Sequence, residues 1–287
     1  MRIASFIVAG RPTYGIVTPA GVVDAGLRLG SRHPTLSSLL EADELSALEA
    51  LDGASPDHGM HAVRWLPPIP RPGKVFCVLL NYETSRLAQG RPKLQYPHIV
   101  TRFGDTHVGS GSPIVKPAGT EEFDYEGEVA VVIGRAGRYI SRARAWAHVL
   151  GLAAYNDATP RDWMRHSRQF TAAKSFPATA GFGPWITTLD EIGEPDAVSL
   201  QTRLNGDVVQ SGSLGDLSHP IPELVEYVSS FTELYPGDVI ATGTPAGSGY
   251  KRMPPRFLRP GDVVEVDVAG VGILTNAVEP ELVPAHA

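Results

Sequence analysis

Three acidic side chains alternate with other residues at the start of an apolar run in the middle of the chain. The sequence over 123–128 is Phe-Asp-Tyr-Glu-Gly-Glu, and an uncharged stretch over 129–134 follows it directly. The run predicts a β-strand, in which alternate side chains share a face, so Asp124, Glu126 and Glu128 should lie together. Neighbouring carboxylates with limited hydration repel, and a hard divalent cation bound by their oxygens would relieve the repulsion. A solvated outer face of an antiparallel strand is the alternative interpretation.

A divalent cation would need ligands beyond Glu126 and Glu128, because such ions take about six oxygens with water included. Asp157 is the leading candidate for a third carboxylate, since it follows a short apolar segment at a turn where a side chain can project into a cleft. The alternative is an ordinary turn, in which the side chains of Asn156 and Asp157 bond to the local backbone.

Three further polar residues could act beside such an ion. Lys174 is a lone cation in the mostly uncharged stretch 171–177, and a lysine near bound carboxylates can orient water or stabilise an enolate. Arg161 could clamp a substrate carboxylate with two hydrogen bonds. Thr244 follows a predicted strand in a glycine-containing loop and offers a hydroxyl and an amide to an oxyanion. A solvated lysine and a local salt bridge between Arg161 and Asp162 are the plainer alternatives.

Composition narrows the class of protein. The chain has 287 residues, of which 43% are hydrophobic and 20% charged, as expected for a globular protein with a substantial core. Its net charge of −6 argues against a nucleic-acid partner. Cys77 is the only cysteine, which excludes an internal disulfide and a cysteine-rich zinc site. No apolar run approaches the ~20 residues that span a bilayer, and residues 1–17 are typical of a hairpin more than of a signal peptide, so we expect a cytoplasmic protein.

The same sequence suggests two domains. A β-meander is expected over residues 1–30, and leucines at helical spacing predict a helix over 35–51. Four prolines in 66–73 then form a stiff connection. We therefore predict a small N-terminal α/β domain over 1–70 and a catalytic domain over 71–287.

Within the second part, apolar runs and turn residues predict the elements around the candidate residues. We expect a buried strand at 74–80, a helix at 143–150, a strand at 152–155 and an amphipathic helix at 221–234. The segment 83–118 is punctuated by proline and glycine and is expected to be a long irregular loop, which in a compact domain is usually functional or disordered.

Taken together, these segments resemble the fumarylacetoacetate hydrolase family. The matching motifs are collinear over roughly residues 75–278, which makes the set much more specific than any single motif. They are Leu-Asn-Tyr at 80–82, the acidic stretch at 123–128, Asn-Asp-Ala-Thr-Pro-Arg-Asp at 156–162, Lys-Ser-Phe at 174–176, Gly-Pro-Trp at 183–185, Asn-Gly at 205–206, Pro-Gly-Asp-Val-Ile at 236–240 and Thr-Gly-Thr-Pro-Ala-Gly at 242–247.

The resemblance implies an α+β fold, a β-rich mixed β-roll behind a small N-terminal domain, and usually a homodimer. It also implies Mg²⁺ or Mn²⁺ held by Glu126, Glu128 and Asp157. Lys174 would then lie beside the metal, with Arg161 reaching the substrate, and both are expected to be catalytic.

The resemblance further implies the nature of the substrate. Tyr82, Arg161, Met164 and Thr244 are the residues expected to contact it. Family substrates are typically small 2-oxo or 1,3-dicarbonyl acids, as found in aromatic catabolism. A bound ion acts as a Lewis acid on such a carbonyl and stabilises the enolate that forms.

Three positions depart from the family pattern. Hydrolytic and decarboxylating members typically carry a histidine and a glutamate on a mobile lid just after the Asn-Tyr pair, where this chain has Ser85 and Ala88. A glutamine common after the Arg-Asp pair is Met164, which suggests a less polar pocket and a more apolar substrate tail. Without a general base, water activation should fall by roughly 10²–10⁴-fold.

The nearby residues that could replace the base are Glu83, His98 and His107. The first expectation is a metal-dependent enzyme that cleaves a C–C bond of a 2-oxo or dicarbonyl acid by hydrolysis. A decarboxylase, tautomerase or hydratase is the close alternative, which the missing pair favours. A family member that binds metal and ligand without turnover is the alternative of another class.

Overall fold

One large mixed β-sheet forms the centre of the fold. The structure is a computed structural model that describes residues 1–283. The strands lie in the order β3 (Gly21–Asp24), β2 (Arg11–Thr18), β1 (Arg2–Val8), β13 (Ala180–Thr188), β11 (Val149–Asn156), β10 (Gly127–Ile133), β16 (Val239–Ala241), β5 (Val75–Leu79) and β6 (His98–Arg102). Two further strands, β4 (Val63–Trp65) and β7 (His107–Val108), pair with β1 and β13. The sheet therefore runs continuously from the N-terminal residues into the rest of the chain.

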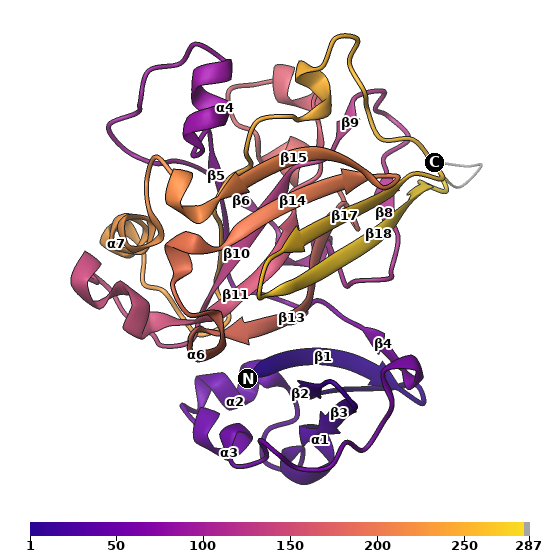
Figure 1. Cartoon of the computed structure of the whole chain (residues 1–287), viewed down its shortest axis with the longest axis vertical. Helices are drawn as coiled ribbons and strands as arrows, with labels where there is room; N and C mark the ends of the chain where they lie inside the picture. Colours follow the sequence, from indigo (N-terminus) through magenta and orange to yellow (C-terminus); the bar gives the residue numbers. More distant parts are fainter. Residues whose placement is uncertain (284–287) are drawn as a thin grey trace.

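A second sheet covers one face of the central strands (Figure 1). Its order is β15 (Asp207–Ser213), β14 (Ser199–Leu204), β17 (Val263–Val268), β18 (Gly272–Pro280) and β8 (Ile114–Lys116). Side chains of both sheets meet in one hydrophobic cluster, to which Val131, Leu152, Val266 and Leu274 belong. A short ladder of β9 (Phe123–Asp124) and β12 (Thr159–Pro160) lies apart from both sheets. This confirms the expected β-rich α+β fold.

Strand β10 is buried on both faces. Val129 and Val131 pack into the cluster shared with the second sheet, whereas Ala130 and Val132 pack into a cluster shared with the N-terminal strands. A strand covered on both faces must be apolar on both, which explains the unbroken run in the sequence. The acidic stretch leads into this interior, so the interpretation of it as a solvated outer face is wrong.

Helices are few and short. The α-helices are α1 (Ala25–Leu29), α2 (Leu36–Glu41), α3 (Leu45–Glu49), α4 (Glu83–Ala88), α5 (Thr171–Lys174), α6 (Leu189–Ile192) and α7 (Ile221–Phe231). The 3₁₀ helices are η1 (Met60–Ala62), η2 (Gly104–Thr106), η3 (Arg142–His148), η4 (Trp163–Arg165), η5 (Pro195–Ala197), η6 (Leu214–Asp216) and η7 (Gly249–Lys251). Across residues 1–283, none of the helices has the length and apolar character needed to cross a membrane.

Several expected elements differ from those observed. The helix expected over 35–51 is divided into α2 and α3, because Asp43 between them adopts the left-handed conformation with φ of 56°. The helix expected at 143–150 is the 3₁₀ helix η3, and β11 begins earlier than predicted. Gly151 does not stop a helix but lies inside β11, where a Cβ would fall 2.1 Å from the Thr187 carbonyl oxygen of the neighbouring strand. The amphipathic helix expected to extend to residue 234 ends at Phe231.

The expectation of an irregular segment over 83–118 is also wrong. It contains α4, β6, β7 and β8, and β6 pairs antiparallel with β5 at the edge of the large sheet. β6 is a strand through its pairing with β5, which lies outside this segment. Proline and glycine on either side of β6 made the segment look irregular in the sequence. By contrast, the meander over the first thirty residues is confirmed as β1 to β3, and β1 continues the sheet through Arg2 and Ile3 opposite Thr187 and Ile186.

Candidate metal and substrate site

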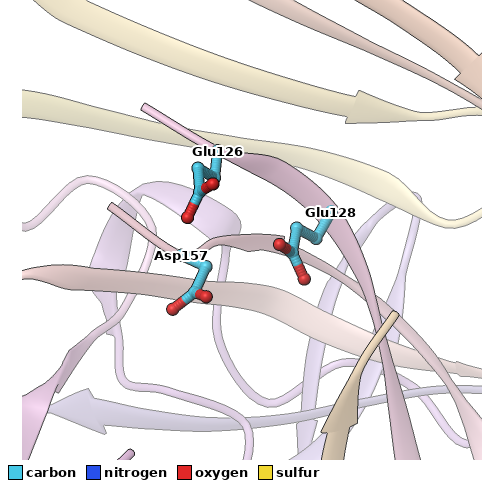
Figure 2. A group of neighbouring side chains, drawn as sticks. All are labelled: Glu126, Glu128 and Asp157. Atoms are coloured by element: carbon cyan, nitrogen blue, oxygen red, sulfur yellow. The ribbon is translucent and has the colours of Figure 1, made fainter. Parts of the chain in front are cut away.

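Three buried carboxylates meet where β10 begins and β11 ends. Glu126 precedes β10, Glu128 lies on it, and Asp157 follows β11. The antiparallel register sets Gly127 opposite Asn156, and the Asp157 amide donates to the Glu126 carbonyl oxygen at 2.8 Å. One oxygen from each carboxylate can be chosen so that all lie within 4.8 Å of one another, and Figure 2 shows the three groups gathered between the two strands.

Asp124 does not join the three carboxylates. The residues between β9 and β10 interrupt the regular strand, so the expected alternation does not extend to Asp124. Its carboxylate instead accepts hydrogen bonds from Arg161 Nε at 2.9 Å and from the Gly249 amide at 2.8 Å. It thereby anchors Arg161 and the turn of η7 to each other.

Three buried cations surround these acids. Lys174 at the end of α5 contacts Glu126 Oε2 at 2.5 Å through Nζ and is also paired with Asp157. Arg102 on β6 lies 2.7 Å from Asp157 Oδ1, and Arg161 lies 2.8 Å from Glu126 Oε1. Together with Asp124, the cluster holds four buried carboxylates against three buried cations, so one negative charge is in excess.

This excess negative charge falls mainly on Glu128. Burial, reinforced by the charges of Asp157 and Glu126, raises the pKa of Glu128 well above its usual value. Burial also acts to raise the pKa of Glu126, but Arg161 and Lys174 outweigh it and lower that pKa to about 2. Glu128 is therefore the carboxylate that lacks a cation. A hard divalent ion held by oxygens fits this donor set, because it would supply the missing positive charge.

A glycine fixes the orientation of Glu128. The Gly243 amide donates to Glu128 Oε2 at 2.9 Å. Gly243 has a φ of 100°, and a Cβ there would lie 2.8 Å from the Val78 carbonyl oxygen, so only glycine fits at this position. The glycine loop noted in the sequence thus positions a candidate ligand.

A cavity of about 430 Å³ opens above Glu126 and Glu128. Its apolar wall is formed by Val78, Leu80, Pro92, Leu94, Met164 and Phe170. Cationic side chains also line it, namely Arg91, Arg161 and Lys251. A cavity that combines a large apolar wall with a few charged groups is the usual form of a small-molecule site.

Of the four residues predicted to contact the substrate, three line the cavity, namely Arg161, Met164 and Thr244. The Thr244 hydroxyl is already used within the protein, since it donates to the Gly127 carbonyl oxygen at 2.8 Å and accepts from Gln210 at 2.7 Å.

Two other predicted residues do not line the cavity. Tyr82 is fully buried in the main hydrophobic cluster, because its backbone forms a β-bridge with Leu217 and its ring packs against Gly212. Tyr82 therefore lies outside this cavity, and its contact with a substrate stays a prediction. Lys174 lies behind Glu126 and Asp157, where it neutralises both.

Arg161 is held with one edge toward the cavity. Its Nε and Nη2 atoms bond to Asp124 and Glu126, while the Tyr250 ring lies 4.3 Å from the guanidinium carbon. The remaining Nη1 atom has only a 3.7 Å contact with the sulfur of Met164. Nη1 is thus the nitrogen best placed to bind an acid group in the cavity.

Arg102 and Tyr250 are site residues that sequence reasoning missed. Arg102 donates from Nε to Asp157 Oδ1 at 2.8 Å and from Nη1 to the Thr179 hydroxyl at 3.0 Å, so it orients a candidate metal ligand. The signal that could have revealed it is the alternation of His98, Val100 and Arg102 over a strand-length segment.

Of the three candidate replacement bases, His98 alone lines the cavity. Glu83 is engaged with Arg86 and with the Ser218 hydroxyl. His107 is held between the Gly104 carbonyl oxygen at 2.9 Å and the Tyr155 hydroxyl at 2.7 Å.

His107 should therefore affect stability and not chemistry. Burial lowers the pKa of His107 to about 4, from a model-compound value of 6.5. The unfolded chain binds the proton first, so this stabilisation is complete above pH 6.5 and is lost as pH falls to about 4. We expect up to about 3 kcal/mol of acid destabilisation from this residue. Urea unfolding of His107→Gln should show a correspondingly weaker pH dependence in that window, and an unchanged dependence would contradict the assignment.

Comparisons with known proteins show which family the chain belongs to. The fumarylacetoacetate (FAA) hydrolase C-terminal family model matches residues 74–279. Human mitochondrial oxaloacetate tautomerase FAHD2A is 37% identical over 274 residues, which is 93% of this chain and 87% of that protein. Oxaloacetate tautomerase YisK of Bacillus subtilis (strain 168) is 38% identical over 226 residues, 77% of this chain and 75% of that protein. The chain therefore belongs to the fumarylacetoacetate hydrolase family.

A solved structure of another protein is similar in fold over nearly the whole chain. The crystal structure of maleylpyruvate hydrolase from Sphingobium sp. SYK-6, in complex with manganese(II) and pyruvate, superposes with a TM-score of 0.82 at 27% identity. The match covers 98% of this chain and all of that one. The family therefore includes both tautomerases and a hydrolase, and membership alone does not choose between these reactions.

Proposed function

We propose that this protein is a divalent-metal-dependent tautomerase that interconverts the keto and enol forms of a small 2-oxo dicarboxylic acid such as oxaloacetate. The observation that carries the proposal is a buried three-carboxylate centre under a cavity lined by Ser85, in a chain where Ser85 and Ala88 stand at the positions at which the family pattern has the water-activating pair. Tautomerisation moves protons and needs no activated water, so the loss of that pair does not hinder it. Two relatives at 37% and 38% identity are named as oxaloacetate tautomerases, which supports the same choice.

The charges around the cavity favour a dianionic substrate. Arg91, Arg161 and Lys251 line it, against the two carboxylates Glu126 and Glu128. A divalent ion at the carboxylates would leave the cavity strongly positive, and such a cavity attracts anions. In this arrangement Arg161 would bind one acid group through Nη1, and the rim cations would bind the other.

We propose Mg²⁺ or Mn²⁺ as the ion, with Glu126, Glu128 and Asp157 as its ligands. When bound, the ion supplies Lewis acidity toward a 2-oxo carbonyl, which makes the neighbouring C–H group more acidic. Lys174 contributes by keeping Glu126 and Asp157 ionised and in place.

The test uses the enol form of oxaloacetate. The loss of its ultraviolet absorbance would be followed with metal-stripped protein, before and after Mg²⁺ is added, against Mg²⁺ without protein. We expect the protein with Mg²⁺ to accelerate ketonisation at least about tenfold over the metal blank, and the stripped protein to have little effect.

A second product assay separates the hydrolytic alternative. Proton NMR of maleylpyruvate and other acylpyruvates would detect pyruvate released by C–C cleavage. Efficient pyruvate release without ketonisation of oxaloacetate would replace the proposed tautomerase with a hydrolase. Metal binding without either reaction would favour the non-catalytic alternative.

A further inference from the structure

Strand β6 carries two polar side chains to the site from the same face. Alternate residues of a strand point the same way, so His98, Val100 and Arg102 share one face of β6. Val100 and Arg102 are buried on that face, and Arg102 reaches Asp157. His98 opposes Leu79 across the strand pair, and both residues line the cavity. The strand that orients one candidate ligand thus also places an imidazole at the substrate cavity.

Few side chains of the cavity wall can both accept and donate a proton near neutral pH. Glu126 and Glu128 are assigned to the ion. The guanidinium groups of Arg91 and Arg161 and the ammonium of Lys251 are hydrogen-bond donors without an acceptor atom.

Two further ionisable side chains line the cavity, those of Tyr250 and His98. The Tyr250 phenol is a poor acid, because burial raises its pKa above the ordinary value of 10.0. An imidazole has two ring nitrogens, one that can accept a proton and one that can donate a proton. Among the groups that line the cavity within residues 1–283, His98 carries the only imidazole.

We propose that His98 is the proton-transfer residue of this enzyme, acting at C3 of the 2-oxo acid. The assignment rests on the proposed tautomerase function. The neutral imidazole takes a proton from C3, the electrons of that C–H bond form the C2=C3 double bond, and the π electrons of the C2=O bond move onto the C2 oxygen. The C2 oxygen gains a proton from solvent, and the imidazolium returns its proton to solvent. In the reverse direction the imidazolium protonates C3 and the C2 hydroxyl loses its proton, so atoms and charge balance.

The surroundings of His98 suit this exchange. Its side chain is exposed in the cavity, so solvent can reach the ring. The Phe170 ring lies 6.3 Å from the imidazole, centre to centre, and Leu94 lines the same cavity, so apolar groups lie near the ring. The position differs from that of Ser85 on α4, where the family pattern expects a histidine.

The experiment compares His98→Ala with the wild-type enzyme, both loaded with Mn²⁺. His61→Ala is the control, since His61 is an exposed histidine that does not line the cavity. Ketonisation of enol-oxaloacetate gives kcat and KM, and NMR in D₂O gives the rate of deuterium entry at C3. We expect kcat and the exchange rate of His98→Ala to fall roughly 10²–10⁴-fold, with KM within about threefold of wild type.

Chemical rescue distinguishes proton transfer from a structural role. Free imidazole should restore at least about tenfold of the lost rate in His98→Ala, because the open cavity admits it, and should not affect His61→Ala. His98→Gln, which keeps a polar side chain, should be as inactive as the alanine variant. Mn²⁺ affinity, measured by electron paramagnetic resonance, should be unchanged in all variants.

Two results would overturn the assignment while leaving the proposed function intact. The first is near-normal kcat in His98→Ala. The second is a loss of activity that imidazole does not rescue, with or without weaker Mn²⁺ binding, because His98 would then be structural. An inactive wild-type enzyme with Mn²⁺ bound would instead refute the proposed function, and the assignment with it.

Discussion

Replacing Glu128 with glutamine is expected to abolish turnover and to weaken divalent-metal binding by on the order of 100-fold or more. Changes beyond the direct ligands typically cost 10–100-fold in affinity, so the loss of a ligand charge should cost roughly that or more. The same change should raise the stability of the metal-free protein. Glu128 is buried beside Asp157 and Glu126 and has a strongly raised pKa, so the wild type must tolerate repulsion that an amide removes.

Two measurements check these effects. Isothermal titration calorimetry with Mn²⁺ measures the metal affinity, and thermal unfolding in the presence of a chelator measures the stability of the metal-free protein. Glu279→Gln is the matched control, because Glu279 is an exposed residue on β18 away from the cavity. Retained metal-dependent activity in Glu128→Gln would show that the metal site has been assigned to the wrong residues.

Replacing Lys174 with methionine is expected to lower turnover by roughly 10²–10³-fold, the usual cost of removing one electrostatic stabiliser. It should also destabilise the metal-free protein by about 3–5 kcal/mol, because Glu126 and Asp157 would remain buried without their shared cation. A divalent ion at the same carboxylates would offset part of that loss. The thermal shift on adding Mg²⁺ should therefore be larger in Lys174→Met than in the wild type.

Thermal unfolding with and without Mg²⁺ measures the change in stability, and the ketonisation assay measures the change in turnover. Lys93→Met serves as the control, since Lys93 is exposed and does not line the cavity. Normal turnover in Lys174→Met would remove this lysine from the mechanism. A thermal shift no larger than that of wild type would contradict its place beside the ion.

The sequence predicted the centre of the site because that information is local. Glu126 and Glu128 immediately precede or begin a strand, and Asp157 follows another, which made Asp157 the leading candidate for a third carboxylate. The family resemblance then implied the set of three. The antiparallel register of β10 and β11 then brings them together. The β-rich fold followed from the collinear motifs and from the short apolar runs.

The sequence did not predict the features that depend on tertiary pairing. The alternation over 98–102 could have suggested a strand, but only its pairing with β5 places Arg102 beside Asp157 and His98 at the cavity. Tyr82 was expected at the substrate, yet its position in the core depends on distant residues. The homodimer and the cytoplasmic location remain predictions.

We propose that Glu126, Glu128 and Asp157 form one metal centre beneath the cavity. A crystal structure of the protein with Mn²⁺, analysed through the anomalous scattering of the ion, would locate the bound ion. We predict one strong anomalous peak within coordination distance of oxygens from all three carboxylates, and none in Glu128→Gln crystals grown at the same Mn²⁺ concentration. A saturating Mn²⁺ soak that leaves the three carboxylates without a peak, or places it elsewhere, would refute this metal centre.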